Sequence, residues 1–445
     1  MSDTIAAFAT PPGIGGVAVL RVSGPDAERI LRAAFGKRMI SHRLTHGALI
    51  DPETGEAIDE CMAVLMRAPR SFTREDVAEI HCHGGVAVMD RALRVVIRQG
   101  ARPAEPGEFT RRAFENGRID LAQAEAVMRL IGARGEAAAR AALRQMRGGV
   151  SRFVKEAAAE LVDMLAGIEA AIDFPDEVEE WETAARIADL TGKLAHKLEE
   201  ASDPRAGRVL DDGLDVAITG PPNAGKSSLL NALLAEDRAI VHESPGTTRD
   251  VLFAEAQVAG MRVRLSDAAG LRDTDDPVES IGVSRARERL DQADLVIMVV
   301  DASVPEVPIL PRVARDRLII ALNKNDLRAA LDGSMLGAGS PCLSVSAATG
   351  DGLDALRSLI AERAAALAPE SAILTGARHA GAALNAARSL RDARASLLDE
   401  SLRGAALDLA AIDLKDALRE LSLVTGEDAS ESVVNRVFST FCVGK

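Results

Sequence analysis

The stretch TGPPNAGKSSLLNALL, residues 219–234, has the spacing of a phosphate-binding loop. Its two glycines, Lys226 and Ser227 follow the apolar run 214–219 and precede a Leu-rich segment, which is the strand–loop–helix context of a P-loop. In such a loop, backbone N–H groups at the helix start surround the phosphates, the Lys neutralises their charge and the Ser hydroxyl binds Mg²⁺. We therefore expect the centre of the chain to be a nucleotide-binding α/β domain.

Four later segments indicate which nucleotide the loop binds. Thr247-Thr248 precede a strand-like run that leads into DAAG at 267–270, and NKND at 323–326 and SAA at 346–348 each follow another apolar run. A carboxylate at Asp326 can accept hydrogen bonds from both the ring N–H and the exocyclic amine of guanine, and adenine offers no such donor pair. The order of these elements predicts a GTPase. The predicted GTP-binding residues are Asn223, Ala224, Gly225, Lys226, Ser227, Ser228, His242, Glu243, Ser244, Pro245, Gly246, Thr247, Thr248, Asp267, Ala268, Ala269, Gly270, Asn323, Lys324, Asp326, Ser346, Ala347 and Ala348.

Two residues are candidates for driving GTP hydrolysis, Glu279 and Asn223, and each has two interpretations. Ras-like enzymes place a Gln after the DxxG glycine, but this chain has Leu271 there, which cannot orient water. Glu279 is the candidate catalytic carboxylate, acting through a bridging water; alternatively it is a helix N-terminal residue stabilised by the helix dipole. Asn223, with carbonyl groups of residues 242–248, could hold a monovalent cation in place of an arginine finger, or it could simply form the turn.

The remaining chain divides into segments of different texture. Residues 1–118 carry short alternating apolar runs between Gly and Pro, which predicts an α+β domain. Residues 119–212 and 369–445 have apolar residues at helical spacing, and residues 213–368 alternate strands with amphipathic helices. We expect a multidomain α/β plus α+β protein, in which a doubly wound domain is inserted into an all-α helical domain; two separate helical domains are the alternative. The strands expected in the first segment are 17–22, 62–66 and 77–82.

The composition of the 445-residue chain limits its classes of function. With one Trp, no Tyr and ten Phe, the chain is not expected to bind RNA by stacking bases on aromatic side chains. A net charge of −14 argues against indiscriminate binding to nucleic acid or anionic membranes. The four Cys lack CxxC or disulfide-like spacing, and no apolar run is long enough to cross a bilayer, which predicts a cytoplasmic protein without membrane attachment.

Several longer stretches resemble one family. GPPNAGKSSLLN at the P-loop, PGTTRD at 245–250, DAAGLR at 267–272 and the closing FCVGK at 441–445 look like MnmE (also called TrmE), the family of tRNA modification GTPases. DTIAAFATPPGIGGVAVLRVSGP, SFTREDVAEIHCHGG and PGEFTRRAFENGRIDLAQAEAV, all N-terminal to the P-loop, match that family as well. The similarity runs essentially from end to end.

The resemblance implies a homodimer of three-domain subunits, with an N-terminal folate-binding and dimerisation domain, a helical domain and an inserted G domain. It also implies tRNA as substrate and a flavoprotein partner, MnmG, which carries the FAD. The two proteins would add an aminomethyl or carboxymethylaminomethyl group to the wobble uridine, with a one-carbon unit from 5-formyl- or methylene-tetrahydrofolate. The GTPase would depend on potassium through association of the G domains.

The resemblance also implies roles for single residues. Glu279 would be the catalytic carboxylate. The ligands implied for K⁺ are Asn223, His242, Ser244 and Thr247, those implied for Mg²⁺ are Ser227 and Thr248, and those implied for the folate are Arg21, Glu79, Arg118 and Lys445. Two positions depart from the family pattern: Ala268 stands where Thr is usual, and Arg118 where relatives can have Lys, which keeps the charge but changes the contact geometry.

Alternation along the expected strand 77–82 places Glu79, His81 and His83 on one face. Side chains of these types could hold a metal ion, or they could form the polar wall of a pocket, which we favour. A carboxylate can pair with the amine and ring N–H donors of a pterin, and an Arg can bind the carboxylates of a folate's glutamate.

The last residues and one basic segment remain open to two interpretations. A terminal tail normally frays, whereas the resemblance implies that Lys445 contacts the folate; Cys442 is a candidate nucleophile on which we do not commit. Arg140, Arg144 and Arg147 share a helical face, which is either a solvated surface or a strip that contacts tRNA phosphates.

Two other functions compete with tRNA modification. A ribosome-assembly GTPase would share the G domain but carry an RNA-binding module such as a KH domain with its GxxG loop, and the sequence shows no such module. A folate enzyme of the aminomethyltransferase kind would use the G domain only for regulation, and folate turnover without tRNA or MnmG would support it.

Overall fold

The computed structural model describes residues 3–11, 13–174, 179–235, 253–267, 287–336, 339–369, 371–402 and 404–444, without the side chains of residues 180, 235 and 267. The chain forms two compact units. The first unit comprises residues 1–128, 145–187 and 396–445, and the second comprises residues 129–144 and 188–395. The division falls within the segments expected to be helical, and the expected inserted domain, 213–368, lies within the second unit.

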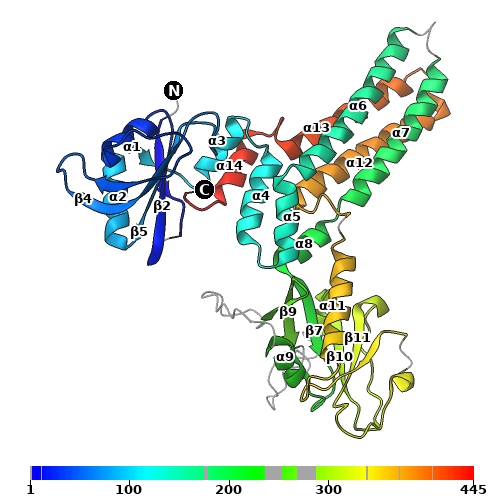
Figure 1. Cartoon of the computed structure of the whole chain (residues 1–445). Helices are drawn as coiled ribbons and strands as arrows, with labels where there is room; N and C mark the ends of the chain where they lie inside the picture. The colour runs from blue at the N-terminus through cyan, green and yellow to red at the C-terminus, as the bar shows by residue number, and fades with distance from the viewer. Residues whose placement is uncertain are drawn as a thin grey trace, which may run out of the picture. The chain divides into compact units, whose positions relative to one another are not determined.

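A six-stranded sheet lies in the N-terminal part of the first unit (Figure 1). Its strand order is β3 (Thr45–Ile50), β4 (Ala57–Met66), β5 (Val77–Gly84), β2 (Gly15–Ser23), β1 (Ile5–Phe8) and β6 (Arg102–Pro103). Neighbouring strands are antiparallel except β1 and β6, which are parallel. The three expected strands are confirmed as parts of β2, β4 and β5, whereas β1 and β3 were not predicted.

The two faces of this sheet differ because side chains alternate along each strand. Helices α1 (Ala27–Phe35) and α2 (Val86–Arg98) pack on one face, over a core that includes Leu20 and Ile80. On the other face, Glu79 and His81 are half-buried. The predicted alternation along β5 is therefore confirmed, and Glu79 and His81 lie on the face opposite this core.

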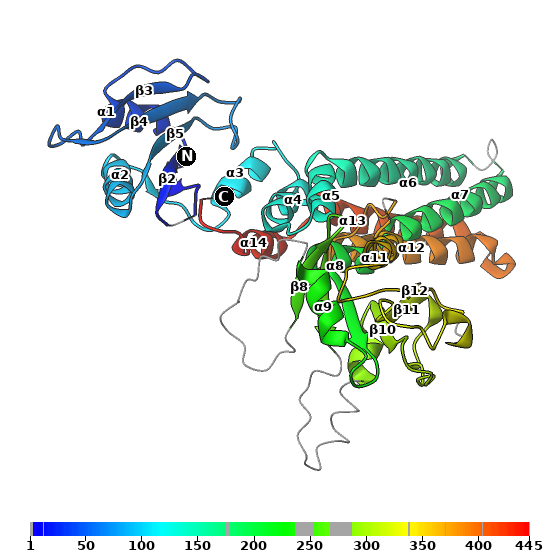
Figure 2. The ribbon, with the colours of Figure 1, turned by 60° about the horizontal axis from the view of Figure 1, so that its bottom comes forward.

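Two further pairs of helices pack together in the first unit. Helix α3 (Glu108–Glu115) contacts α14 (Glu431–Ser439), and α6 (Gly149–Asp173) runs along α13 (Ala406–Thr425), as Figure 2 also shows. Helix α4 (Leu121–Gly132) begins in an apolar cluster that contains the rings of Phe114, Phe438 and Phe441. The Phe438 ring centroid lies 6.1 Å from that of Phe114 and 5.4 Å from that of Phe441, which joins chain segments more than 300 residues apart.

The C-terminal tail is held in place as far as Gly444. Val443 forms an antiparallel bridge with Pro106, and the Gly107 N–H donates to the Cys442 carbonyl at 3.4 Å. Gly444 has φ of 96°, and a Cβ there would collide with the carbonyl of Phe8, so only glycine fits without strain. The described part of the tail is thus paired, and Lys445 lies outside the described residues.

A second six-stranded sheet forms the core of the second unit. Its order is β12 (Cys342–Ser344), β11 (Leu318–Asn323), β10 (Leu295–Asp301), β7 (Leu214–Thr219), β9 (Met261–Asp267) and β8 (Ala254–Val258), and only β8 is antiparallel to its neighbour. Helices α8 (Pro204–Asp212), α9 (Lys226–Ala235) and α11 (Leu353–Leu367) pack on one face. A separate apolar cluster covers the other face, which explains why β10 is buried along six of its seven residues. The predicted doubly wound sheet is confirmed.

The remaining helices are α5 (Glu136–Met146), α7 (Glu180–Ala201) and α12 (Ala377–Leu398), which lie largely in the second unit. Within that unit, Glu199 on α7 accepts a hydrogen bond from Arg391 on α12 at 2.6 Å. A Cβ at Gly192 would press on Arg394, so α7 and α12 pack closely. The short 3-10 helices are η1 (Arg315–Arg317), η2 (Gly333–Leu336) and η3 (Glu400–Leu402).

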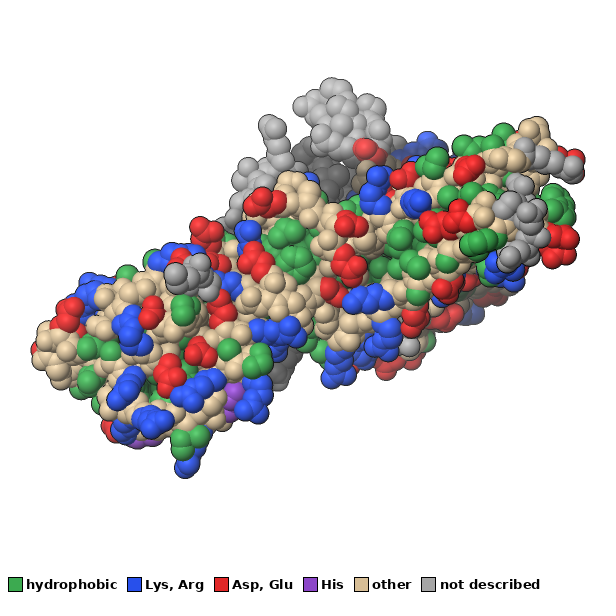
Figure 3. Space-filling model, turned by 90° about the horizontal axis from the view of Figure 1, so that it is seen from above, with side chains coloured by type: hydrophobic (Ala, Val, Ile, Leu, Met, Phe, Trp, Pro, Cys, Tyr) green, Lys and Arg blue, Asp and Glu red, His purple; other side chains and the backbone are tan. Residues whose placement is uncertain are grey.

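On the face that Figure 3 shows, Lys and Arg side chains alternate with Asp and Glu side chains. Among the described helices, none is long and apolar enough to cross a membrane.

Candidate functional site

The P-loop connects β7 to α9 at the carboxyl end of the parallel strands. Gly220 and Gly225 have φ of 147° and 93°, and a Cβ on either would collide with β10 or β11. Glycine is required at both positions because the loop turns this close to the sheet. The Lys226 ammonium group donates to the carbonyl groups of Gly220 at 3.0 Å and Pro221 at 2.9 Å, and it therefore lies within the loop.

Asn323, at the end of β11, connects the P-loop to the segment that follows β12. Its side chain is buried, donates to the Ala224 carbonyl at 2.9 Å and accepts from the Ala347 N–H at 3.0 Å. A side-chain amide can do both because it carries a donor and an acceptor. The phosphate loop and the SAA segment are thereby fixed relative to each other, although they are more than 100 residues apart in sequence.

The acidic residue expected to bind guanine is also held by its neighbours. The Asp326 carboxylate accepts a hydrogen bond from the Ser346 hydroxyl at 2.5 Å. Lys324, with φ of 65°, donates to Asp301 at 2.5 Å. Burial opposes the ionisation of Asp301, but hydrogen bonds from Lys324 and Ser303 outweigh it and lower the pKa of that carboxyl. The structure therefore brings together the residues predicted from NKND and SAA.

The residues predicted to hold metal ions and activate water are only partly described. Asn223 has φ of 61° in the P-loop, and Ser227 and Ser228 lie in the first turn of α9. Asp267 ends β9 beside Ile218 of β7, which places its backbone near the loop. The predicted residues that lie outside the described part of the chain are His242, Glu243, Ser244, Pro245, Gly246, Thr247, Thr248, Ala268, Ala269, Gly270, Glu279 and Lys445.

A cavity of about 640 Å³ opens on the polar face of the first sheet; we call it the arginine cavity. Arg21 on β2 and Glu79 on β5 are direct partners in the strand register, and the Arg21 Nε donates to Glu79 at 2.8 Å. Both side chains are largely buried, at 18% and 17% exposure. The other oxygen of Glu79 lies 3.4 Å from the His81 ring. The lining residues are Arg21, Met66, Pro69, Arg70, Ser71, Phe72, Arg74, Val77, Glu79, Arg118 and Val127.

Arg118 reaches the same cavity from the loop after α3. Its guanidinium donates to the Ser71 carbonyl and lies 5.1 Å from the centre of the Phe72 ring, with which it makes a cation–π contact. Arg21 lies 5.9 Å from the same ring. The structure thus brings together Arg21, Glu79 and Arg118, which the resemblance implies for a common ligand, and the fourth implied residue, Lys445, lies outside the described residues.

The metal alternative for β5 finds no support in the geometry. His83 pairs with Asp59 at 2.7 Å, while the His81 ring lies 3.4 Å from Glu79. The three side chains therefore do not converge on one point. No group of three His, Cys, Asp or Glu side chains among the described residues could hold a metal ion.

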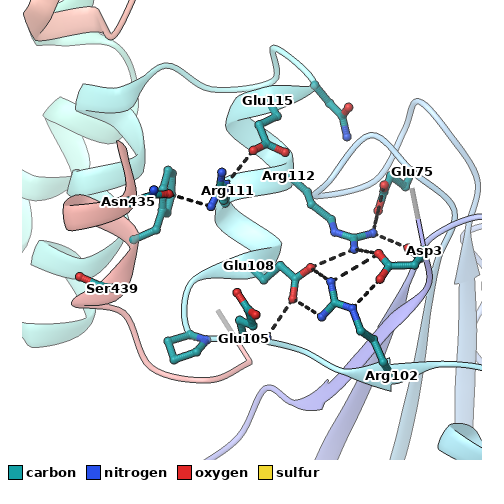
Figure 4. A pocket seen from close by; sticks show the side chains of 13 residues that line it. Asp3, Glu75, Arg102, Glu105, Glu108, Arg111, Arg112, Glu115, Asn435 and Ser439 are labelled. Carbon is teal, nitrogen blue, oxygen red and sulfur yellow. Dashed lines mark hydrogen bonds and ion pairs between the residues drawn. The ribbon is translucent and has the colours of Figure 1, made fainter. Parts of the chain in front are cut away.

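A second cavity, of about 800 Å³, is lined by α3, α14 and β6 in the first unit; we call it the ionic-network cavity (Figure 4). Arg112 donates to Asp3 at 2.7 Å and to Glu108 at 2.9 Å, and it also pairs with Glu75. Arg102 pairs with Asp3 and, through two hydrogen bonds, with Glu108. Figure 4 shows that these side chains point toward one another, so the network satisfies its own charges.

The predicted basic strip lies partly on α5. Arg140 and Arg144 are exposed, but Arg140 pairs with Glu136 at 2.7 Å, one turn earlier. Arg147 is exposed and follows the end of the helix. The pairing reduces the local positive charge, and contact with tRNA remains a hypothesis.

Sequence analysis did not identify several residues of these sites. Phe72, Arg70 and Arg74 line the arginine cavity, and Asp301 fixes Lys324. The stretch SFTRED at 71–76 contributes to the prediction only through the resemblance. An aromatic residue flanked by Arg70 and Arg74, between two predicted strands, was the available signal.

Comparison with known proteins gives a consistent result over the whole chain. A family model described as "MnmE helical domain" matches residues 121–442, and one described as "GTP-binding protein TrmE N-terminus" matches residues 4–118. A protein of Geobacter metallireducens named tRNA modification GTPase MnmE is 44% identical over 464 residues and is covered completely, as is this chain. A protein of the same name from Symbiobacterium thermophilum is 46% identical, with 100% of this chain and 99% of the relative covered. The G domain of the T. maritima FeoB iron transporter is 28% identical over 34% of this chain and 98% of its own, with a TM-score of 0.26.

Proposed function

This chain belongs to the MnmE family of tRNA modification GTPases and hydrolyses GTP, and we propose that it is the potassium-dependent, folate-binding subunit of a tRNA-modifying complex. With the flavoprotein MnmG, it installs an aminomethyl or carboxymethylaminomethyl group on the wobble uridine of tRNA. It acts in the cytoplasm as a homodimer. The similarity over the full length of the chain carries this proposal.

The folate part of the proposal rests on the arginine cavity. Glu79 lies in it as a carboxylate acceptor fixed by Arg21, which suits the amine and ring N–H donors of a pterin. Phe72 supplies an aromatic wall between Arg21 and Arg118. Tetrahydrofolate would supply the one-carbon unit, and these side chains would bind and orient it. Relatives with Lys at position 118 lack the bidentate geometry of Arg. The affinity of this chain for the folate can therefore differ from theirs.

The potassium part rests on the chemistry of the P-loop. Asn223 occupies a left-handed turn position in the loop, where its side-chain oxygen can lie beside the phosphates. Together with His242, Ser244 and Thr247, it would hold K⁺ in the place of an arginine finger. Ser227 and Thr248 would hold Mg²⁺, and Glu279 would polarise the attacking water because Leu271 cannot.

The decisive experiment is mass spectrometry of nucleosides from total tRNA, in cells that lack this gene and in cells in which it is restored. Loss of the modified wobble uridine, with recovery on complementation, is the expected result. An unchanged nucleoside profile would contradict the role in tRNA modification and would favour a GTPase of ribosome assembly.

The cation dependence is tested separately on the purified protein. We expect faster GTP hydrolysis in potassium than in sodium salts at equal ionic strength, and a loss of about 100-fold or more in kcat for Glu279→Gln. The matched control is Glu136→Gln, because Glu136 is an exposed carboxylate on α5 whose partner is Arg140. Equal rates in the two salts would remove the potassium site from the proposal.

A further inference from the structure

We propose that Arg70, Arg74 and Arg118 form a subsite for the γ-linked glutamate tail of polyglutamylated folates, at the mouth of the arginine cavity. The inference rests on the proposed folate-binding function. It adds that the cavity selects folates with a polyglutamate tail. It assigns a role to Arg70 and Arg74, which the folate-binding set of Arg21, Glu79, Arg118 and Lys445 does not include.

The first observation is the charge balance of the cavity. Its lining contains four arginines, Arg21, Arg70, Arg74 and Arg118, and one carboxylate, Glu79. Arg21 already pairs with Glu79 at 2.8 Å. Among the described residues, the other three arginines form no ion pair with a carboxylate. A cavity with this surplus of positive charge is suited to a ligand with several negative charges.

The second observation is that two of these arginines are held in place without an acid. Arg118 is fixed by the Ser71 carbonyl and the Phe72 ring. Arg74 donates to the Asn116 carbonyl at 2.9 Å, and its own backbone has φ of 59°, which is unfavourable for a residue with a side chain. Neutral carbonyl partners orient a guanidinium but leave its charge uncompensated.

The third observation is that the arginines repel one another. Burial and the nearby charge of Arg74 together lower the pKa of Arg118. Elsewhere in the first unit, arginines of a comparable cluster are matched by Asp3, Glu75 and Glu108. Among the described residues, acids therefore surround one set of arginines and not the other, and an anionic ligand would offset the repulsion.

The number of carboxylates in the ligand distinguishes a folate with a long glutamate tail from a folate with one glutamate. A folate monoglutamate carries two carboxylates, fewer than the three uncompensated guanidinium groups. Each further γ-linked glutamate adds one carboxylate on a flexible chain. Arg70 and Arg74 are exposed at the mouth of the cavity, whereas Arg21 and Glu79 lie deep in it. A ligand that places its pterin against Glu79 would thus extend its glutamates toward Arg70 and Arg74.

The test compares 5-formyl-tetrahydrofolate monoglutamate and triglutamate by calorimetry on the full-length protein. We expect the triglutamate to bind about tenfold more tightly, since two exposed charge pairs contribute about that factor together. In the double variant Arg70→Gln, Arg74→Gln, the ratio of the two affinities should fall to about one. The matched control is Arg111→Gln, in the ionic-network cavity, because Arg111 is a partly exposed arginine paired with Glu115; it should leave the ratio unchanged.

Each outcome decides a different point. Equal affinities for the two ligands in the unaltered protein would overturn the subsite but leave the folate function intact, whereas binding of neither ligand would overturn the folate function itself. A ratio that persists in the double variant would overturn the assignment to Arg70 and Arg74. If the double variant binds neither ligand, the single variants Arg70→Gln and Arg74→Gln are measured, and an unchanged ratio in both overturns the proposal. Weaker tRNA binding with an unchanged ratio would assign these arginines to tRNA phosphates instead.

Discussion

The two cavities of the first unit are both rich in arginine, yet they differ in what surrounds the guanidinium groups. In the ionic-network cavity, Arg102 and Arg112 are enclosed by Asp3, Glu75 and Glu108, at distances that allow direct hydrogen bonds (Figure 4). In the arginine cavity, three of four arginines have no acidic partner among the described residues. The larger cavity is thus a self-satisfied structural network, and the smaller one has charge left over for a ligand.

This difference shows that neither the size of a cavity nor its number of arginines identifies a binding site. An arginine surrounded by carboxylates stabilises the fold, because removing it leaves their negative charges less compensated. An arginine held only by carbonyl groups and an aromatic ring remains available to an anion. The balance of charge is therefore the informative property, and it can be tested by substitution on each side.

The largest expected effect is on stability, from Arg112→Met. Arg112 is 7% exposed and holds three carboxylates, so its loss should lower the free energy of opening of this region by about 3 kcal/mol. Hydrogen exchange of peptides from β1 and α3 in the full chain measures this. The control is Arg118→Met, which should cost less, about 1–2 kcal/mol, because only a cation–π contact and one carbonyl hydrogen bond are lost. Equal losses of opening free energy in the two variants would contradict the difference between the two cavities.

The second effect is on ligand binding, from Glu79→Gln. The substitution replaces charge-assisted hydrogen bonds to the pterin by neutral ones, and we expect affinity for 5-formyl-tetrahydrofolate to fall about 30-fold, or about 2 kcal/mol. Glu108→Gln, in the other cavity, should leave that affinity unchanged while it lowers stability. If Glu108→Gln weakened folate binding as strongly as Glu79→Gln, the two cavities could not be assigned separate roles.

The third effect is on acid stability. Burial would raise the pKa of Glu108, but hydrogen bonds from Arg102, the Glu105 N–H and Arg112 outweigh it, and the pKa lies below the ordinary value of 4.5. A group with a lowered pKa in the folded state stabilises the protein above its unfolded pKa, and this stabilisation is lost as pH falls through the folded pKa. The protection of α3 against hydrogen exchange should therefore decrease as the pH drops below about 4.5, and it should decrease less steeply in the Glu108→Gln variant. An acid profile that is the same in both proteins would remove Glu108 as the titrating group.

The smallest effect is that of salt. Raising the salt concentration from about 0.05 M to about 0.5 M should weaken folate binding a few-fold, because exposed charges at the mouth of the arginine cavity are screened. The buried pairs around Arg112 are screened less, so protection of β1 and α3 should change little over the same range. Folate affinity that is independent of salt would show that Arg70 and Arg74 make no ionic contact with the ligand.

Much of the fold follows from local patterns in the sequence. The apolar runs at 214–219 and 318–322 predicted β7 and the main part of β11, and the P-loop glycines predicted the turn between β7 and α9. Strand alternation predicted that Glu79 and His81 would lie on one face. These features could be predicted because hydrophobic periodicity and glycine spacing act over a few residues. The strands β1 and β3 were not predicted, because β1 has only four residues and β3 begins with Thr-His-Gly, which leaves it a short apolar run.

The sites could be predicted only where a motif or the family resemblance fixed them. Asp326, Asn323 and Ser346 were expected from NKND and SAA, and the structure brings them together. Arg21, Glu79 and Arg118 were expected only through the resemblance, since nothing in their spacing indicates that they share a cavity. Arg70, Arg74 and Asp301 were not foreseen at all, because their roles depend on neighbours that are distant in sequence.

The sequence alone determined that this protein binds GTP, that its G domain is a doubly wound sheet, and that helical segments flank it, since local spacing encodes loops, strands and helix faces. Only the tertiary structure decided which arginines are neutralised. The register of β2 on β5 sets Arg21 against Glu79. The packing of α3 against the segments that precede β1 and β5 places Arg112 among Asp3, Glu75 and Glu108, whereas no carboxylate among the described residues pairs with Arg70 or Arg74. Charge compensation depends on distances of a few ångströms between segments up to about 100 residues apart, and no local pattern in the sequence specifies those distances.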